Sequence, residues 1–141
     1  MATGDHFSDW LDQFAYLDVE EIAALPEQQR SLALVHQFAQ ITSWDGAGSL
    51  FYNHADMVDD VARAFDAFAE PELAEKIRGV SGILKPFVAG NPPDWQEIII
   101  EQCMDGAASQ DVEQLDDLVE ARWEAFYENL EILARSKGWI T

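Results

Sequence analysis

The sequence has few of the residues from which disulfides, membrane anchors and export signals are built. Cys103 is the one cysteine among 141 residues, so no disulfide can form within the chain. No apolar run approaches the roughly 20 residues needed to cross a bilayer. Residues 1–6 lack the basic start and apolar run of a secretory signal. These absences predict a cytoplasmic protein that does not bind membranes.

Basic residues are scarce as well. The chain has 8 Lys and Arg against 27 Asp and Glu, which gives a formal net charge of −19 and an isoelectric point near 4.1. Nucleic acids and anionic membranes are themselves polyanions, so direct binding to either is disfavoured. The charge therefore favours a basic protein or a cation as the partner.

Motifs for metals, cofactors and catalysis are missing. The histidines and Cys103 show no metal-ligand spacing, and the glycines of residues 45–49 lack the Lys-Ser or Lys-Thr of a phosphate-binding loop. Cys103 lies in an apolar segment with no basic neighbour, which predicts a buried, inert thiol. His36 is expected at the edge of the core, satisfied by a hydrogen bond. We predict no cofactor, no metal and no enzymatic activity.

One cluster leaves an enzymatic alternative open. His54 is followed closely by Asp56, Asp59 and Asp60, and a histidine with carboxylates can act as an acid–base pair or hold a cation. In the interpretation that we favour, Asp56 caps a helix and the other two aspartates lie on its solvent side.

Apolar residues are plentiful, by contrast. They make up 48% of the chain, with five Trp and eight Phe, so a chain of this length can bury a core. Their spacing predicts an all-α, irregular single-domain bundle over residues 1–141, of about six helices with a long C-terminal helix. Asp94 is expected to cap one of them, with a short strand at Ile98–Ile100 as the alternative there. Helical spacing runs through residues 7–17, 18–25, 26–44, 56–68, 70–81, 95–104 and 112–137.

The last predicted helix carries a stripe of carboxylates opposite its apolar face. Steps of three or four residues advance about 4.5–6 Å along a helix, against about 3.4 Å between phosphates on one DNA strand. Like charges four residues apart weaken a helix by about 0.2–0.5 kcal/mol per pair, so folding alone does not call for this pattern. We predict that a partner binds the stripe and the aspartates 56, 59 and 60. The stripe consists of Glu113, Asp117, Glu120, Glu124, Glu128 and Glu131.

A glycine-containing turn joins two of the predicted helices. Gly46 and Gly48 permit backbone angles that other residues resist, and Phe51 and Tyr52 can anchor the turn on the core. Asn53 is placed to cap the helix that follows. We interpret these residues as a structural motif rather than a ligand pocket.

The same stretch carries a family resemblance. Residues 41–53, the helix end Ala64–Phe68 and the segment Leu115–Leu130 resemble the bacterial DNA-mimic protein domain family over about residues 30–135. The resemblance implies an all-helical fold whose acidic surface occupies the DNA-binding face of a regulatory protein.

Three functions follow as hypotheses. The leading one is sequestration of a basic, DNA-binding or regulatory protein through DNA mimicry. The second is inhibition of a toxin or nuclease, in which the acidic surface enters an enzyme's cleft. In the third, acidity is a general adaptation to high salt, or merely solvates the surface, and mimics nothing. A homodimer is left open by the sequence.

Overall fold

The computed structural model describes residues 3–140, and these form helices and connecting turns without a strand. The all-α prediction is confirmed. Two short 3₁₀ helices, η1 and η2, accompany the α-helices, and the short helix α4 falls in a segment where the spacing predicted only a turn. The elements are α1 Thr3–Asp12, α2 Val19–Ala23, α3 Glu27–Asp45, α4 Ser49–Asn53, η1 Ala55–Met57, α5 Val58–Ala67, α6 Pro71–Leu84, η2 Lys85–Val88, α7 Trp95–Met104 and α8 Ser109–Ser136.

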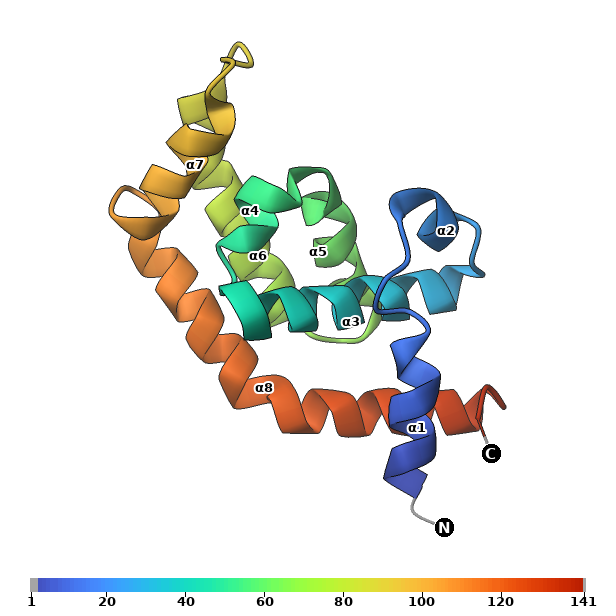
Figure 1. Ribbon diagram of the computed structural model, residues 1–141. Helices are drawn as coiled ribbons and strands as arrows, with labels where there is room; N and C mark the ends of the chain where they lie inside the picture. Colours follow the sequence, from blue (N-terminus) through green and yellow to red (C-terminus); the bar gives the residue numbers. More distant parts are fainter. Residues whose placement is uncertain (1–2, 141) are drawn as a thin grey trace.

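Helix α3 is the central element, with α4, α5 and α6 on one side of it and α8 on the other (Figure 1). The sequence predicted one apolar face, but its middle is buried on more than one side. The polar Gln37 is buried too. Its burial is tolerated because its Nε2 donates hydrogen bonds to the carbonyl oxygens of Phe14 and Leu17 at 3.0 and 2.9 Å. The buried residues of α3 are Leu32, Ala33, Val35, His36, Gln37, Phe38 and Ala39.

Helix α8 is the longest helix and bends around the rest of the molecule (Figure 1). Its two halves pack against different elements. Lys76 of α6 contacts Asp111 and Gln114 in the first half, whereas His36 of α3 contacts Tyr127 in the second. The long C-terminal helix was predicted, but the change of direction was not.

The end of helix α6, η2, α7 and the chain between them form the arm that projects at the upper left of Figure 1. Helix α6 continues through Gly82 to Leu84, beyond the end that glycine suggested. Helix α7 begins at Trp95 as predicted, so the strand alternative at Ile98–Ile100 is wrong. The predicted cap is also wrong, since the Asp94 side chain makes no capping hydrogen bond.

The two ends of the described chain meet. After α8, Gly138 adopts a positive φ of 75° and the chain turns back, so that the Trp139 ring stacks on Trp10 at a centroid distance of 5.8 Å. Asp18 caps α2 in a reciprocal arrangement with Glu21. Within residues 3–140, no helix is both long enough and apolar enough to cross a membrane.

Candidate protein-binding surface

Five of the six predicted stripe residues on α8 are exposed, and we call them the acidic ridge: Glu113, Asp117, Glu120, Glu124 and Glu128. They lie opposite the buried face of the helix, which contains Val112, Leu115, Val119, Phe126 and Leu130. The sixth, Glu131, is half-buried and pairs with Arg135 at 3.0 Å. Helical periodicity thus places the ridge on the solvent side of α8 along most of its length.

The basic residue in the middle of α8 pairs away from the ridge. Arg122 is turned away and donates from Nε and Nη2 to the two carboxylate oxygens of Glu70, at 3.0 and 2.5 Å. Glu70 is only 5% exposed, so this pair fixes the connection between α5 and α6 to α8. Among the described residues, no ion pair includes a ridge carboxylate.

The other predicted partner-binding residues, Asp56, Asp59 and Asp60, lie on η1 and the first turn of α5. All three are exposed, but Asp60 pairs with Arg63. The predicted cap is wrong, because Met57 occupies the N-cap position of α5 and no side chain caps it. Asp59 and Asp60 lie on the solvent side of the first turn, as the favoured interpretation predicted, where the positive end of the helix dipole favours negative charge.

The structure does not bring the two acidic groups together. Helix α5 packs on α3 and α6, and α8 packs on the other side of α3 (Figure 1). A hollow of about 360 Å³ between α2, α3 and α5 is bordered by Asp56 and Asp60, and also by Arg30 and Arg63. The α5 aspartates therefore share their surroundings with cations, whereas the acidic ridge does not.

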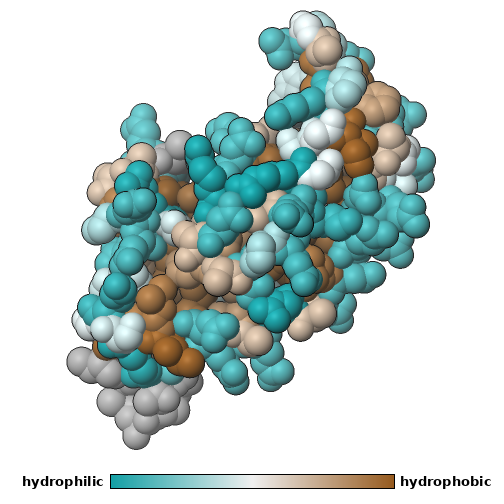
Figure 2. Space-filling model, turned by 180° about the vertical axis from the view of Figure 1, so that it is seen from behind, coloured by the Kyte–Doolittle hydropathy of each residue, from teal (hydrophilic) through white to brown (hydrophobic). Residues whose placement is uncertain are grey.

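Polarity by itself does not distinguish the ridge. Figure 2 shows hydrophilic side chains over most of the back of the molecule, with hydrophobic surface between them and on the projecting arm. Exposed apolar side chains on that arm include Phe87, Trp95 and Met104. What sets the ridge apart is a run of carboxylates that form no ion pair with any residue that the structure describes.

The glycine-containing turn lies against the first half of α8. Gly46 ends α3 with a φ of 84°, and the Ala47 N–H donates to Asp116 Oδ1 at 2.7 Å. Gly48 lies so close to α7 and α8 that an added Cβ would stand 3.5 Å from Val112. The turn therefore holds α3, α7 and α8 together.

The aromatic pair and Asn53 that follow belong to α4. Phe51 is buried in the core and Tyr52 is half-buried. The prediction that Asn53 caps the next helix is wrong: its Nδ2 donates to Ser49 Oγ at 2.9 Å, and its Oδ1 accepts from Gln96 of α7 at 3.1 Å.

Charge crowding is visible at Asp116, next to the ridge. Burial raises the pKa of this carboxyl group; the hydrogen bond from Ala47 opposes the rise, and the charge of Asp117 adds to it. Asp116 was not among the predicted site residues, because its place on α8 does not reveal that the turn after α3 approaches it.

The remaining candidates for chemistry are accounted for by packing. Cys103 is 5% exposed, and burial raises the pKa of its thiol to about 11, so the prediction of a buried thiol is confirmed. His36 is 6% exposed, and its Nδ1 lies 2.9 Å from Tyr127 Oη. His54 is half-buried, at the junction of α4 and η1. In residues 3–140, no three His, Cys, Asp or Glu side chains are grouped so as to hold a metal ion.

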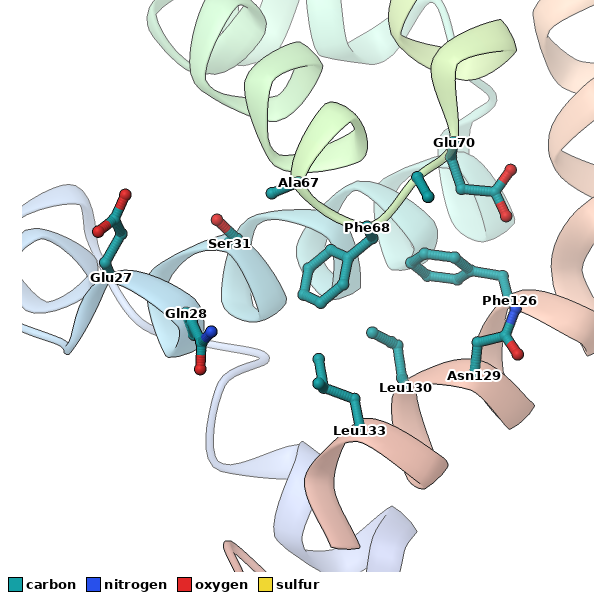
Figure 3. A pocket seen from close by; sticks show the side chains of 11 residues that line it. Glu27, Gln28, Ser31, Ala67, Phe68, Glu70, Phe126, Asn129, Leu130 and Leu133 are labelled. Atoms are coloured by element: carbon teal, nitrogen blue, oxygen red, sulfur yellow. The ribbon is translucent and has the colours of Figure 1, made fainter. Parts of the chain in front are cut away.

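Another hollow, of about 640 Å³, lies away from the ridge, between α3, the α5–α6 connection and the second half of α8. Figure 3 shows Phe68, Leu130 and Leu133 pointing into it. Its two carboxylates are Glu27 and Glu70, and Glu70 is already held by Arg122. This hollow contains no ridge residue and does not enlarge the acidic surface.

Comparison with known proteins bears on this acidic surface. The family described as DMP19-like protein matches residues 23–137, which is most of the chain. The chain belongs to this family. It is a family of DNA-mimic proteins, so the resemblance predicted from the glycine-containing turn and the C-terminal helix is confirmed. A search among curated proteins finds no match, and a search among solved structures finds none either.

Proposed function

We propose that the protein presents the acidic ridge of α8 in place of a DNA backbone and thereby sequesters a basic DNA-binding or regulatory protein. The observation that carries this proposal is the ridge itself, five exposed carboxylates in succession with no ion pair among the described residues. Membership in a DNA-mimic family supports the same function.

The dimensions of the ridge suit this role. Glu113 and Glu128 are separated by about 22 Å along a helix that rises 1.5 Å per residue. One DNA strand presents about seven phosphates over that length, and the ridge presents five carboxylates. The carboxylates are spaced more widely than DNA phosphates, but a flexible Lys or Arg side chain of the partner can reach across the difference.

The charge of the whole protein supports capture at a distance. A net charge of −19 steers a basic partner toward the molecule and raises the association rate, mainly at low ionic strength. This long-range attraction does not distinguish one basic protein from another. We therefore assign the choice of partner to the surface around the ridge.

The test is capture from an extract of the source cells at low salt with immobilised protein, followed by elution with duplex DNA. A DNA-binding protein that wild type retains and DNA displaces supports the proposal. A matched control must keep the net charge of the ridge variant. The ridge variant is E113Q/D117Q/E120Q/E124Q/E128Q, and the matched control is E72Q/E75Q/E97Q/E101Q/D105N, which removes five exposed carboxylates elsewhere.

The expected result is loss of the partner with the ridge variant and retention with the control. Recovery of no DNA-binding protein, or equal retention by both variants, overturns the proposal. Recovery of a nuclease or toxin by the ridge supports the inhibitor alternative instead. Unfolding that becomes markedly harder with rising salt, together with no captured protein, supports acidity as an adaptation to salt.

A further inference from the structure

Two hollows lie along the line where α8 passes α3, and they meet at Trp123. One, of about 480 Å³, is bordered by α1, α3 and the second half of α8, and its residues include Asp12, His36, Trp123, Glu124, Glu128 and Glu131. The other, of about 460 Å³, is bordered by Thr42, Ser43, Asp116, Val119, Glu120 and Trp123. We call the pair the α3–α8 groove. Three of the five ridge carboxylates border it.

Two residues that border the hollows each have a buried polar atom without a hydrogen-bond partner in the described chain. These are His36, through Nε2, at the first hollow and Thr42, through Oγ1, at the second. Leaving such an atom unpaired costs about 1–3 kcal/mol, so a polar atom kept in this state at a cavity indicates a place for a ligand's hydrogen-bonding group. The carboxylates at the same cavities indicate that the group is a cation.

The aromatic wall decides which cation fits. Trp123 lies between the hollows, and its ring packs against Tyr127 at a centroid distance of 5.1 Å. A planar guanidinium stacks on an indole and binds a carboxylate with two parallel hydrogen bonds, whereas a lysine ammonium is a compact, strongly hydrated point charge. The groove therefore suits arginine better than lysine.

The two unpaired atoms, His36 Nε2 and Thr42 Oγ1, also suit a guanidinium. Burial lowers the pKa of His36, with the charge of Asp12 opposing it, so the imidazole is held neutral. In the tautomer whose Nδ1 proton is donated to Tyr127, Nε2 is an acceptor. Thr42 Oγ1 also accepts. A guanidinium carries five N–H donors, enough for a carboxylate and one of these atoms at once.

We propose that the α3–α8 groove binds an arginine-containing segment of the partner, with one guanidinium in each hollow on the two sides of Trp123. This proposal rests on the proposed function and names the part of the partner that the protein recognises. It assigns recognition to the groove and leaves long-range attraction to the rest of the ridge.

The test uses end-blocked hexa-arginine and hexa-lysine peptides as probes, titrated into the full chain at moderate salt. Binding is measured by calorimetry, and the indole N–H signals are followed by NMR. Hexa-arginine is expected to bind at least about tenfold more tightly than hexa-lysine. It should shift the Trp123 signal, assigned with W123F, while leaving that of Trp95 on α7 in place. Equal affinity for the two peptides, or a shift at Trp95 only, overturns the proposal.

Two double variants locate the site with matched charge. E124Q/E128Q removes two carboxylates at the groove, and E113Q/D117Q removes two from the same ridge outside it. The first is expected to weaken hexa-arginine binding at least about tenfold, and the second no more than about threefold. Thermal unfolding of both variants verifies that they are folded.

Equal weakening by the two variants overturns the groove proposal but leaves the ridge, and with it the proposed function, intact. Conversely, failure to capture any DNA-binding protein from extract overturns the proposed function without touching the peptide result. The two proposals can therefore fail separately.

Discussion

The acidic ridge on α8 and the aspartates at the start of α5 have the same charge but different surroundings. In the part of the chain that the structure describes, the ridge carboxylates form no ion pair, and the arginine in the middle of α8 is held by Glu70. Asp56 and Asp60 border one hollow together with Arg30 and Arg63, and Asp60 is paired with Arg63. In the sequence, both regions are simply runs of acidic residues. They differ in where the eight Lys and Arg side chains lie in the folded protein.

The largest difference between the regions is expected in partner binding. E120Q/E124Q/E128Q should raise the Kd for the captured DNA-binding protein about 100-fold, since each carboxylate that meets a cation in an interface contributes about 1 kcal/mol. D56N/D59N/D60N removes the same number of charges and should change the Kd less than about threefold. Surface plasmon resonance measures both. Equal effects would show that only the net charge matters.

The next largest effect is expected on stability, and it distinguishes Arg122 beside the ridge from Arg63 beside the α5 aspartates. R122M leaves the buried Glu70 carboxylate without its partner. Loss of one member of a fully buried ion pair lowers the free energy of unfolding by about 3–5 kcal/mol. Because Arg122 is partly exposed, we expect a smaller loss of about 2 kcal/mol. R63M breaks an exposed pair and should change the free energy of unfolding by no more than about 0.5 kcal/mol. Urea unfolding measures both variants. A small loss for R122M would mean that the connection between α5 and α6 is not fastened by this pair.

A smaller effect on stability should have opposite signs in the two regions. E120Q/E124Q/E128Q relieves three like-charge pairs at four-residue spacing, the first of them between Asp116 and Glu120. It should add roughly 0.6–1.5 kcal/mol to the free energy of unfolding at low salt. D56N/D59N/D60N removes charges that favour the start of α5 and should lower it by about 0.3–1 kcal/mol. Both changes should fade near 1 M salt, where screening is strong. Equal signs in denaturant unfolding would contradict the different roles assigned to the two groups.

The smallest effect is expected at Asp116, beside the ridge. Its pKa is raised in the folded protein, so the folded state is stabilised relative to the unfolded state when this group is protonated, and that contribution is lost as pH rises through the folded pKa. D116N keeps an oxygen acceptor for Ala47 and should raise stability at neutral pH by no more than about 0.5 kcal/mol, with no gain in acid. Thermal unfolding across pH measures this. A gain that grows in acid would contradict the assigned direction.

Local sequence signals predicted the helices well where the whole signal lies within one element. The helix predicted over residues 95–104 coincides with α7, Trp95–Met104, and the helix predicted over residues 18–25 contains α2, Val19–Ala23. Capping was predicted poorly at Asp56 and Asp94, because a side chain that favours a cap does not determine the backbone angles at that residue. The short α4 was missed since five residues are too few to show a helical period.

The candidate surface was predicted only in part for the same reason. The exposure of the ridge follows from the period of α8 alone. The groove depends on α1 and α3 meeting α8, and neither Asp12 nor Thr42 has any feature in its own segment that indicates this contact. Trp123 follows Val119 at helical spacing, yet it is only half-buried and borders both hollows of the groove.

The sequence alone determined the helical class, the strong negative charge and the side of α8 that carries it, because each depends on composition or on the period of a single helix. The tertiary structure decided which carboxylates remain without cations and which of them border the α3–α8 groove. Both outcomes depend on residues far apart in the sequence, such as Glu70 and Arg122, which come together only when the helices pack.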